Sequence, residues 1–141
     1  MNQMPLIVKV IIAGVVSSLI ISVLFLALDF LGVFQSLGIP MRVPVDKSIL
    51  EWFAMRLVIP GFCSLLFLLP VAATVSNLMR GLVIGLLPAG HLLFIGVPIN
   101  DMGIVEMNLG TSVILIAIVF SLFWGGLAGL ILDRIVRNPG S

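Results

Sequence analysis

The chain has 141 residues, of which 61% are hydrophobic and 9% are charged, and its formal net charge is +1. A soluble domain carries about 25% charged residues and a fold of this length could not bury so much apolar surface, so the composition excludes a soluble globular protein. The small net charge provides no basic patch for nucleic acid. One cysteine excludes an internal disulfide, and one histidine leaves too few ligands for a multi-ligand metal site.

The first predicted membrane helix covers residues 9–31. Lys9 and Asp29 bracket an uncharged apolar run, and a helix between them spans about 30 Å, one hydrocarbon thickness. The run is longer than the apolar region of a signal peptide, so we interpret it as a retained membrane span. Small residues at every fourth position place a close-packing face on this helix. They are Gly14, Ser18 and Ser22.

Residues 32–47 interrupt the helical pattern, because Gly38, Pro40 and Pro44 forbid a continuous helix. The segment is nevertheless rich in apolar residues. We expect it to lie on the bilayer surface or against a partner protein.

A second helix is predicted to restart near Ser48, which has the spacing of a capping box with Glu51. Trp52 suits the aromatic belt at a membrane interface, and Arg56 can extend towards lipid headgroups, so both are predicted interface anchors. The membrane span of this helix is predicted at residues 57–79.

A short turn around residues 76–81 is expected next, with Arg80 as an interface anchor. Because the turn is short, the second and third spans are predicted to be antiparallel neighbours. The third span covers residues 81–100. It carries a second face of small residues, formed by Gly81, Gly85 and Ala89.

The fourth span covers residues 107–132, and Arg134 follows it as a further interface anchor. A third face of small residues lies on this span and consists of Ser121, Gly125 and Gly129. The three small faces can pack against one another within one bundle, or one of them can face another subunit.

His91 is the one ionisable residue predicted near the middle of the membrane, where such groups are costly and often functional. Three roles remain open: axial ligand to a haem or a chlorophyll, proton relay, or a neutral interhelical hydrogen bond. One histidine per chain cannot form a bis-histidine haem site without a second subunit.

These elements predict an all-α polytopic membrane protein, with residues 1–141 forming one domain of four transmembrane helices in an antiparallel bundle. Both termini and residue 80 then share one side of the membrane. That side carries Lys9, Arg80, Arg134 and Arg137, and the opposite side carries Arg42, Lys47 and Arg56. Since positive residues favour the cytoplasm, both termini are expected to be cytoplasmic.

Two stretches resemble those of uncharacterised small bacterial inner-membrane proteins with four helices. One is RGLVIG at residues 80–85, and the other is the glycine-rich SLFWGGLAGLIL at residues 121–132. The resemblance implies a location in the inner (plasma) membrane and carries over no catalytic residues.

The sequence contains no recognisable catalytic constellation, so we do not expect an enzyme. The expected function is that of an accessory or assembly subunit, with the lipid bilayer and other membrane subunits or a second copy as partners. The alternatives are a small channel or transporter acting as a homo-oligomer, and a subunit that contacts a pigment or haem through His91.

Overall fold

The computed structural model describes residues 4–39, 49–70, 74–91 and 111–137. Every regular element in these ranges is a helix, which agrees with the all-α prediction. The elements are α1 (Leu6–Phe30), α2 (Val33–Ser36), α3 (Ile49–Ser64), the 3₁₀ helix η1 (Leu65–Leu68), α4 (Asn77–His91) and α6 (Thr111–Arg137).

Three helical segments among the described residues are long and apolar enough to cross a membrane. They are Leu6–Phe30, Ile49–Leu68 and Ile114–Arg137. The chain therefore has helices of the kind found in membrane proteins, as its composition predicts. Helix α4 has 15 described residues, which correspond to about 22 Å and fall short of a full crossing on their own.

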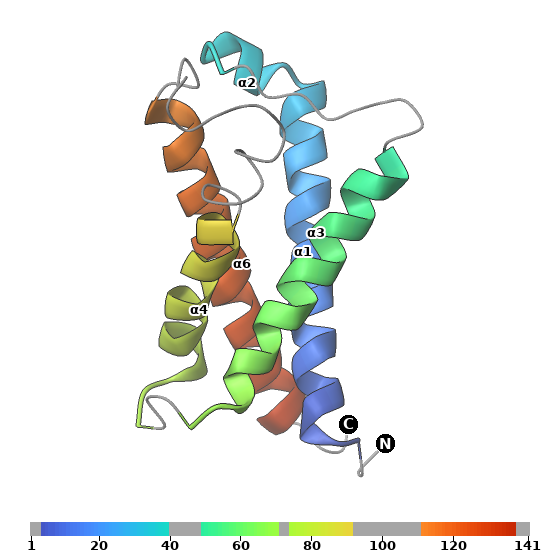
Figure 1. Ribbon diagram of the computed structural model, residues 1–141, viewed down its shortest axis with the longest axis vertical. Coiled ribbons are helices and arrows are strands. Elements are labelled where there is room, and N and C mark those ends of the chain that lie inside the picture. Colours follow the sequence, from blue (N-terminus) through green and yellow to red (C-terminus); the bar gives the residue numbers. More distant parts are fainter. Residues whose placement is uncertain (1–3, 40–48, 71–73, 92–110, 138–141) are drawn as a thin grey trace.

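Figure 1 shows α1 and α4 running from one end of the molecule and α3 and α6 running back towards it. We call this the terminal end; it holds the start of α1, the start of α4 and the end of α6. The opposite, remote end holds the end of α1, helix α2 and the start of α3. Helix α6 packs extensively against α4 and also against α1, whereas α3 packs mainly against α1.

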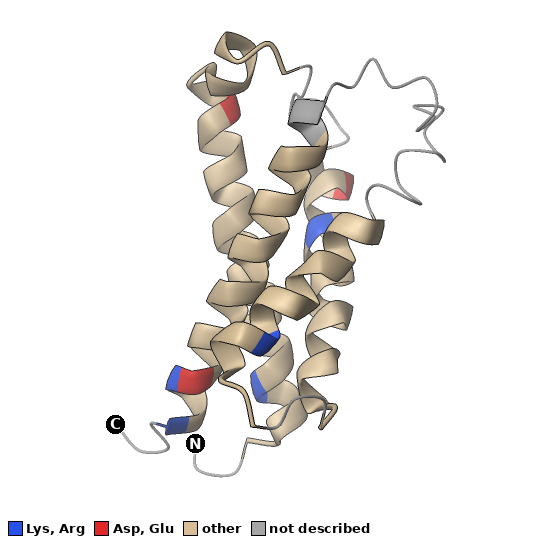
Figure 2. Ribbon diagram, turned by 90° about the vertical axis from the view of Figure 1, so that its left-hand side faces the viewer, with Lys and Arg blue, Asp and Glu red and all other residues tan. Residues whose placement is uncertain are grey.

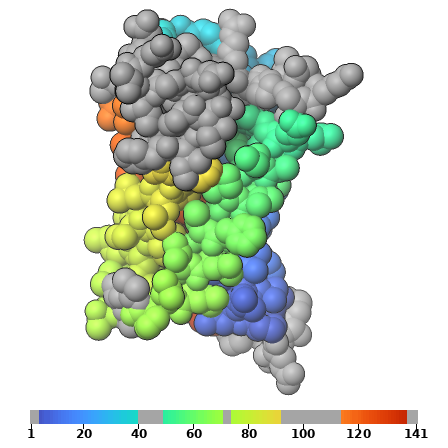
Figure 3. Space-filling view, in the orientation of Figure 1, coloured from blue at the N-terminus to red at the C-terminus, as the bar shows by residue number. Residues whose placement is uncertain are grey.

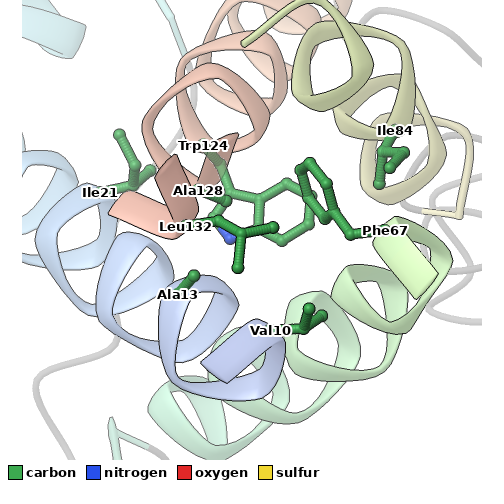
Figure 4. Packing of buried hydrophobic residues seen from close by; sticks show 8 residues of the cluster. All are labelled: Val10, Ala13, Ile21, Phe67, Ile84, Trp124, Ala128 and Leu132. Atoms are coloured by element: carbon green, nitrogen blue, oxygen red, sulfur yellow. The ribbon is translucent and has the colours of Figure 1, made fainter. Parts of the chain in front are cut away.

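The centre of the molecule is a cluster of buried apolar side chains from α1, η1, α4 and α6 (Figure 4). Its members are Val10, Ala13, Ile21, Phe67, Ile84, Trp124, Ala128 and Leu132. The small alanines let the helices come close, and the two aromatic rings fill the space between them.

The helix predicted to restart near Ser48 does so, but its predicted span, residues 57–79, is wrong at the end. Helix α3 begins at Ile49, and the helical segment ends at Leu68. Leu69 is extended, with φ −71° and ψ 139°, as expected for a residue that precedes a proline. Pro70 therefore ends the helix, although the apolar run continues beyond it.

The predicted turn at residues 76–81 is also misplaced, because α4 already begins at Asn77. The main-chain N–H of Arg80 donates to the carbonyl of Ser76 at 3.0 Å, and the N–H of Met79 donates to the Ser76 hydroxyl at 3.4 Å. Ser76 thus stands where a helix-capping serine is favoured, and the change of direction falls between Leu69 and Ser76. Arg80 and Gly81 lie inside the helix.

The described boundaries of α1 and α6 differ less from the predicted ones. Helix α1 starts three residues before the predicted position and ends one residue before it. Helix α6 continues past the predicted end at residue 132 to Arg137. Parts of the predicted third and fourth spans, residues 92–100 and 107–110, lie outside the described residues.

Part of the predicted interfacial segment packs against its own chain. Gly32 and Gly38 have φ values of +71° and +67°, which glycine adopts readily, and they flank the short helix α2. The ring centroid of Phe34 lies 4.7 Å from that of Phe25, and both Phe34 and Ile39 are buried. The expectation that this segment offers its apolar side chains to a bilayer or a partner is therefore wrong for Phe34 and Ile39. Residues 40–47 lie outside the described residues.

Candidate functional site

Two of the three predicted small faces meet each other, between α4 and α6. A Cβ atom placed on Gly81 would collide with the carbonyl oxygen of Gly125, and one placed on Gly85 would collide with that of Ser121. A Cβ atom on Gly129 would likewise collide with the carbonyl oxygen of Asn77. The two backbones touch along this line, which only glycine permits. Ala89, the last residue of the α4 face, is also buried.

The third small face, on α1, lies against α3. Gly14 faces Ser64, whose side chain would collide with a Cβ atom at Gly14. The Ser18 hydroxyl donates a hydrogen bond to the backbone carbonyl of Arg56. Ser22 is buried with 1% of its surface exposed. All three small faces therefore make contacts within this chain.

Trp124 joins these two contacts at the centre of the molecule. Its ring lies within the apolar cluster, as Figure 4 shows, and its Nε1 donates to the carbonyl oxygen of Gly14 at 2.9 Å. The sequence marked Trp124 only as part of a glycine-rich stretch. Trp124 lies three residues after Ser121 and directly before Gly125. A tryptophan beside two residues of a small face indicates that its indole points towards a close helix contact.

Arg80 closes the terminal end. Its guanidinium donates to the backbone carbonyl oxygens of Phe67 and Leu69, both at 2.7 Å, and to Asn77 Oδ1 at 3.2 Å. Those carbonyls lie in the last turn of η1 and just after it, where helical partners run out. The Asn77 side-chain amide in turn donates to Asp133 Oδ1 at 2.7 Å. The predicted anchor is thus part of a polar clasp that ties η1, α4 and α6 together; the sequence did not identify Asn77 or Asp133 as its members.

The predicted anchors Trp52 and Arg56 lie side by side on α3. The guanidinium carbon of Arg56 lies 4.4 Å from the centroid of the Trp52 ring and 4.2 Å from that of Phe25 on α1. Cation–π attraction is favourable at such distances. Phe25 was not singled out in the sequence, because nothing in the spacing showed that α1 and α3 cross at this point. The fourth predicted anchor, Arg134, is exposed in the last turn of α6.

His91 is the last described residue of α4 and is half-buried. Within the described residues, no group of three or more histidine, cysteine, aspartate or glutamate side chains is placed to hold a metal ion. A haem or chlorophyll at His91 stays a prediction.

No family model, no curated protein and no solved structure matches this chain. The resemblance to small bacterial inner-membrane proteins therefore stays a prediction.

Proposed function

We propose that the chain is an accessory or assembly subunit of the bacterial inner membrane, with four spans in an antiparallel bundle, that packs against partner membrane proteins. The fourth crossing would comprise residues 81–100, of which α4 is the described part. Support for the membrane location comes from large apolar side chains that are exposed on α1, α4 and α6. Examples are Val23 (54% exposed), Val83 (69%) and Phe123 (66%).

The observation that carries the proposed role is the position of α3. Only 6% of the most apolar stretch of the Ile49–Leu68 segment is buried, against 44% for α1 and 33% for α6. Gly61 and Ser64 are buried on the side of α3 that faces α1, and the opposite side, which we call the free side, carries largely exposed side chains. Figure 3 shows this helix forming a broad part of the molecular surface.

The free side of α3 is large and apolar. Met55 and Val58 are 61% and 52% exposed, and Phe62 is 70% exposed. A helix held on one side only, with bulky side chains on the other, has the surface that a neighbouring membrane helix needs for van der Waals packing. The small faces are used inside the chain, so we assign the partner contact to α3 and not to a glycine stripe.

We further propose that both termini face the cytoplasm. The described lysines and arginines gather towards the terminal end (Figure 2). Lys9, Arg80, Arg134 and Arg137 belong to helix turns at that end, whereas Arg56 lies beside Ser18, at the middle of α1. The excess of positive residues favours the cytoplasmic side for the terminal end.

Native purification tests the proposed role. The tagged chain is extracted from its own membranes in mild detergent, and the complex is sized and its proteins are identified by mass spectrometry. We expect one or more integral membrane proteins at a fixed ratio to the chain. A monomer with no co-purifying membrane protein contradicts the proposal, and a complex that contains only copies of this chain favours a homo-oligomer.

A further inference from the structure

Helix α3 contains a proline, Pro60, at a point where a regular helix uses a backbone donor. In such a helix, the N–H of each residue donates to the carbonyl four residues earlier. Pro60 has no N–H, so it cannot donate to the carbonyl of Arg56. The hydroxyl of Ser18 on α1 donates to that same carbonyl. A side chain of the neighbouring helix thus supplies the donor that the proline removes, which is one way in which a membrane helix tolerates proline.

Pro60 divides α3 into two parts that are held differently. None of the residues from the start of α3 to Pro60 is buried, whereas Gly61 and Ser64 after it are. Ser64 lies so close to α1 that a Cβ atom placed on Gly14 would collide with it, and Phe67 of the following η1 is buried too. Figure 1 shows α3 crossing α1, with the start of α3 leaning away from it. Close packing therefore fixes the part after Pro60 and does not fix the part before it.

The contacts that join the first part of α3 to α1 include one hydrogen bond and one cation–π contact. The hydrogen bond is that from Ser18 to the Arg56 carbonyl, and the guanidinium carbon of Arg56 lies 4.2 Å from the centroid of the Phe25 ring. Each contact of this kind favours one conformation by about tenfold. Because lipid chains are as apolar as the side chains of a helix, a membrane helix that moves into lipid meets no hydrophobic penalty. These few contacts thus decide where the first part of α3 lies.

We propose that residues 49–59, which we call the arm, pivot at Pro60 and that the Ser18 hydroxyl is the latch that holds the arm against α1. A proline is a common site of helix bending, since the missing hydrogen bond weakens the helix there. When the hydroxyl leaves the Arg56 carbonyl, the arm swings away from α1 and Arg56 separates from Phe25. The part of α3 after Pro60 stays packed. The latched position dominates, and the open position is a minor state of the same chain. The device rests on contacts within the chain and not on the proposed partner.

A double-mutant cycle tests whether Ser18 replaces the donor that Pro60 lacks. Ser18→Ala should lower the folding equilibrium constant about tenfold, because the Arg56 carbonyl loses a donor in apolar surroundings. With Pro60→Ala the helix regains its own donor, so Ser18→Ala should then cost less than about threefold. The matched control is Ser17→Ala. The Ser17 hydroxyl donates to the Ala13 carbonyl of its own helix at 2.6 Å, so its loss should cost the same with and without Pro60→Ala. Reversible unfolding of the full chain in detergent micelles measures each variant.

Distances between spin labels show whether the arm moves. In a Cys63→Ala background, Leu31→Cys marks the end of α1 and Leu50→Cys marks the arm, at positions that are 72% and 77% exposed. Pulsed electron paramagnetic resonance should give one dominant distance in the native chain. In Ser18→Ala, the population at a longer distance should rise about tenfold. The control pair joins Leu31→Cys to Leu69→Cys, which follows the packed part of the helix, and its distances should stay unchanged.

Two results overturn the device. An equal cost of Ser18→Ala with and without Pro60→Ala would mean that Ser18 does not replace the missing donor. The same distances from the arm to the end of α1 in Ser18→Ala and in the native chain would mean that no latch holds the arm. If Ser18→Ala does not fold, Pro60→Ala must restore its folding. A double variant that stays unfolded, beside a folded Pro60→Ala, contradicts the proposal.

Discussion

The indole Nε1 of Trp124 donates a 2.9 Å hydrogen bond to the carbonyl oxygen of Gly14 inside the protein. The bond connects α6 to α1 at a point where Gly14 has no side chain to shield its backbone. Trp124 also packs between the glycine contact of α4 and α6 and the serine-lined contact of α1 and α3. One residue thus ties both close contacts to a common core.

Trp124→Phe should lower the free energy of unfolding by about 1–3 kcal/mol, since it removes one hydrogen bond and part of a buried ring. The measurement is reversible unfolding in detergent micelles, followed by circular dichroism. Phe123→Leu is the neighbouring control. Its side chain is 66% exposed, so the expected change is within about 0.5 kcal/mol. Equal stability of the two variants would contradict the role given to the indole.

Gly125→Ala should destabilise the chain although alanine favours helix. The new methyl group would meet the backbone of Gly81, which cannot move as a flexible side chain can. We expect a net loss of about 1–3 kcal/mol, typical of overpacking. Gly90→Ala is the matched control, because no atom of the described residues lies within 4 Å of the new methyl group and helix propensity should bring a gain of up to about 1 kcal/mol. A gain in both variants would show that α4 and α6 are not in backbone contact.

The positions of the small residues could be predicted from the sequence, but their partners could not. A spacing of four places Gly81 and Gly85 on one helix face whatever that face contacts. The contacts between α4 and α6 and between α1 and α3 depend on how the helices cross. The spacing of small residues along one helix does not determine that crossing. The turn before α4 was misplaced for another reason. The predicted position followed the length of the hydrophobic run. Pro70, which ends one helix, and Ser76, which begins the next, are the local signals that mark the turn.

The polar clasp predicts a cost at the terminal end. Arg80→Gln removes the donors to the carbonyls of Phe67 and Leu69 and should lower the free energy of unfolding by about 1–2 kcal/mol. Arg80→Lys should lose less, because an ammonium can still reach one carbonyl. Arg134→Gln, on an exposed position of α6, should change stability by less than about 0.5 kcal/mol. The same unfolding assay compares the three, and an equal effect of Arg80→Gln and Arg134→Gln would exclude the clasp.

The proposed orientation can be tested with single cysteines, because Cys63 is the only native one and can be replaced by alanine. Leu37→Cys and Thr74→Cys place exposed thiols at the remote end and at the terminal end, respectively. In intact spheroplasts, a membrane-impermeant maleimide should label Leu37→Cys and should label Thr74→Cys only after the membrane is opened. The reverse pattern would place the termini outside.

Site-specific photo-crosslinking on α3 tests the proposed partner contact most directly. A photoreactive amino acid replaces Phe62 on the free side of α3 or, as a control of similar exposure, Phe123 on α6. After illumination of native membranes, we predict that the Phe62 position forms an adduct with a defined integral membrane protein while the Phe123 position labels lipid. Lipid adducts alone at both positions would contradict the assignment of α3 as the partner-binding helix.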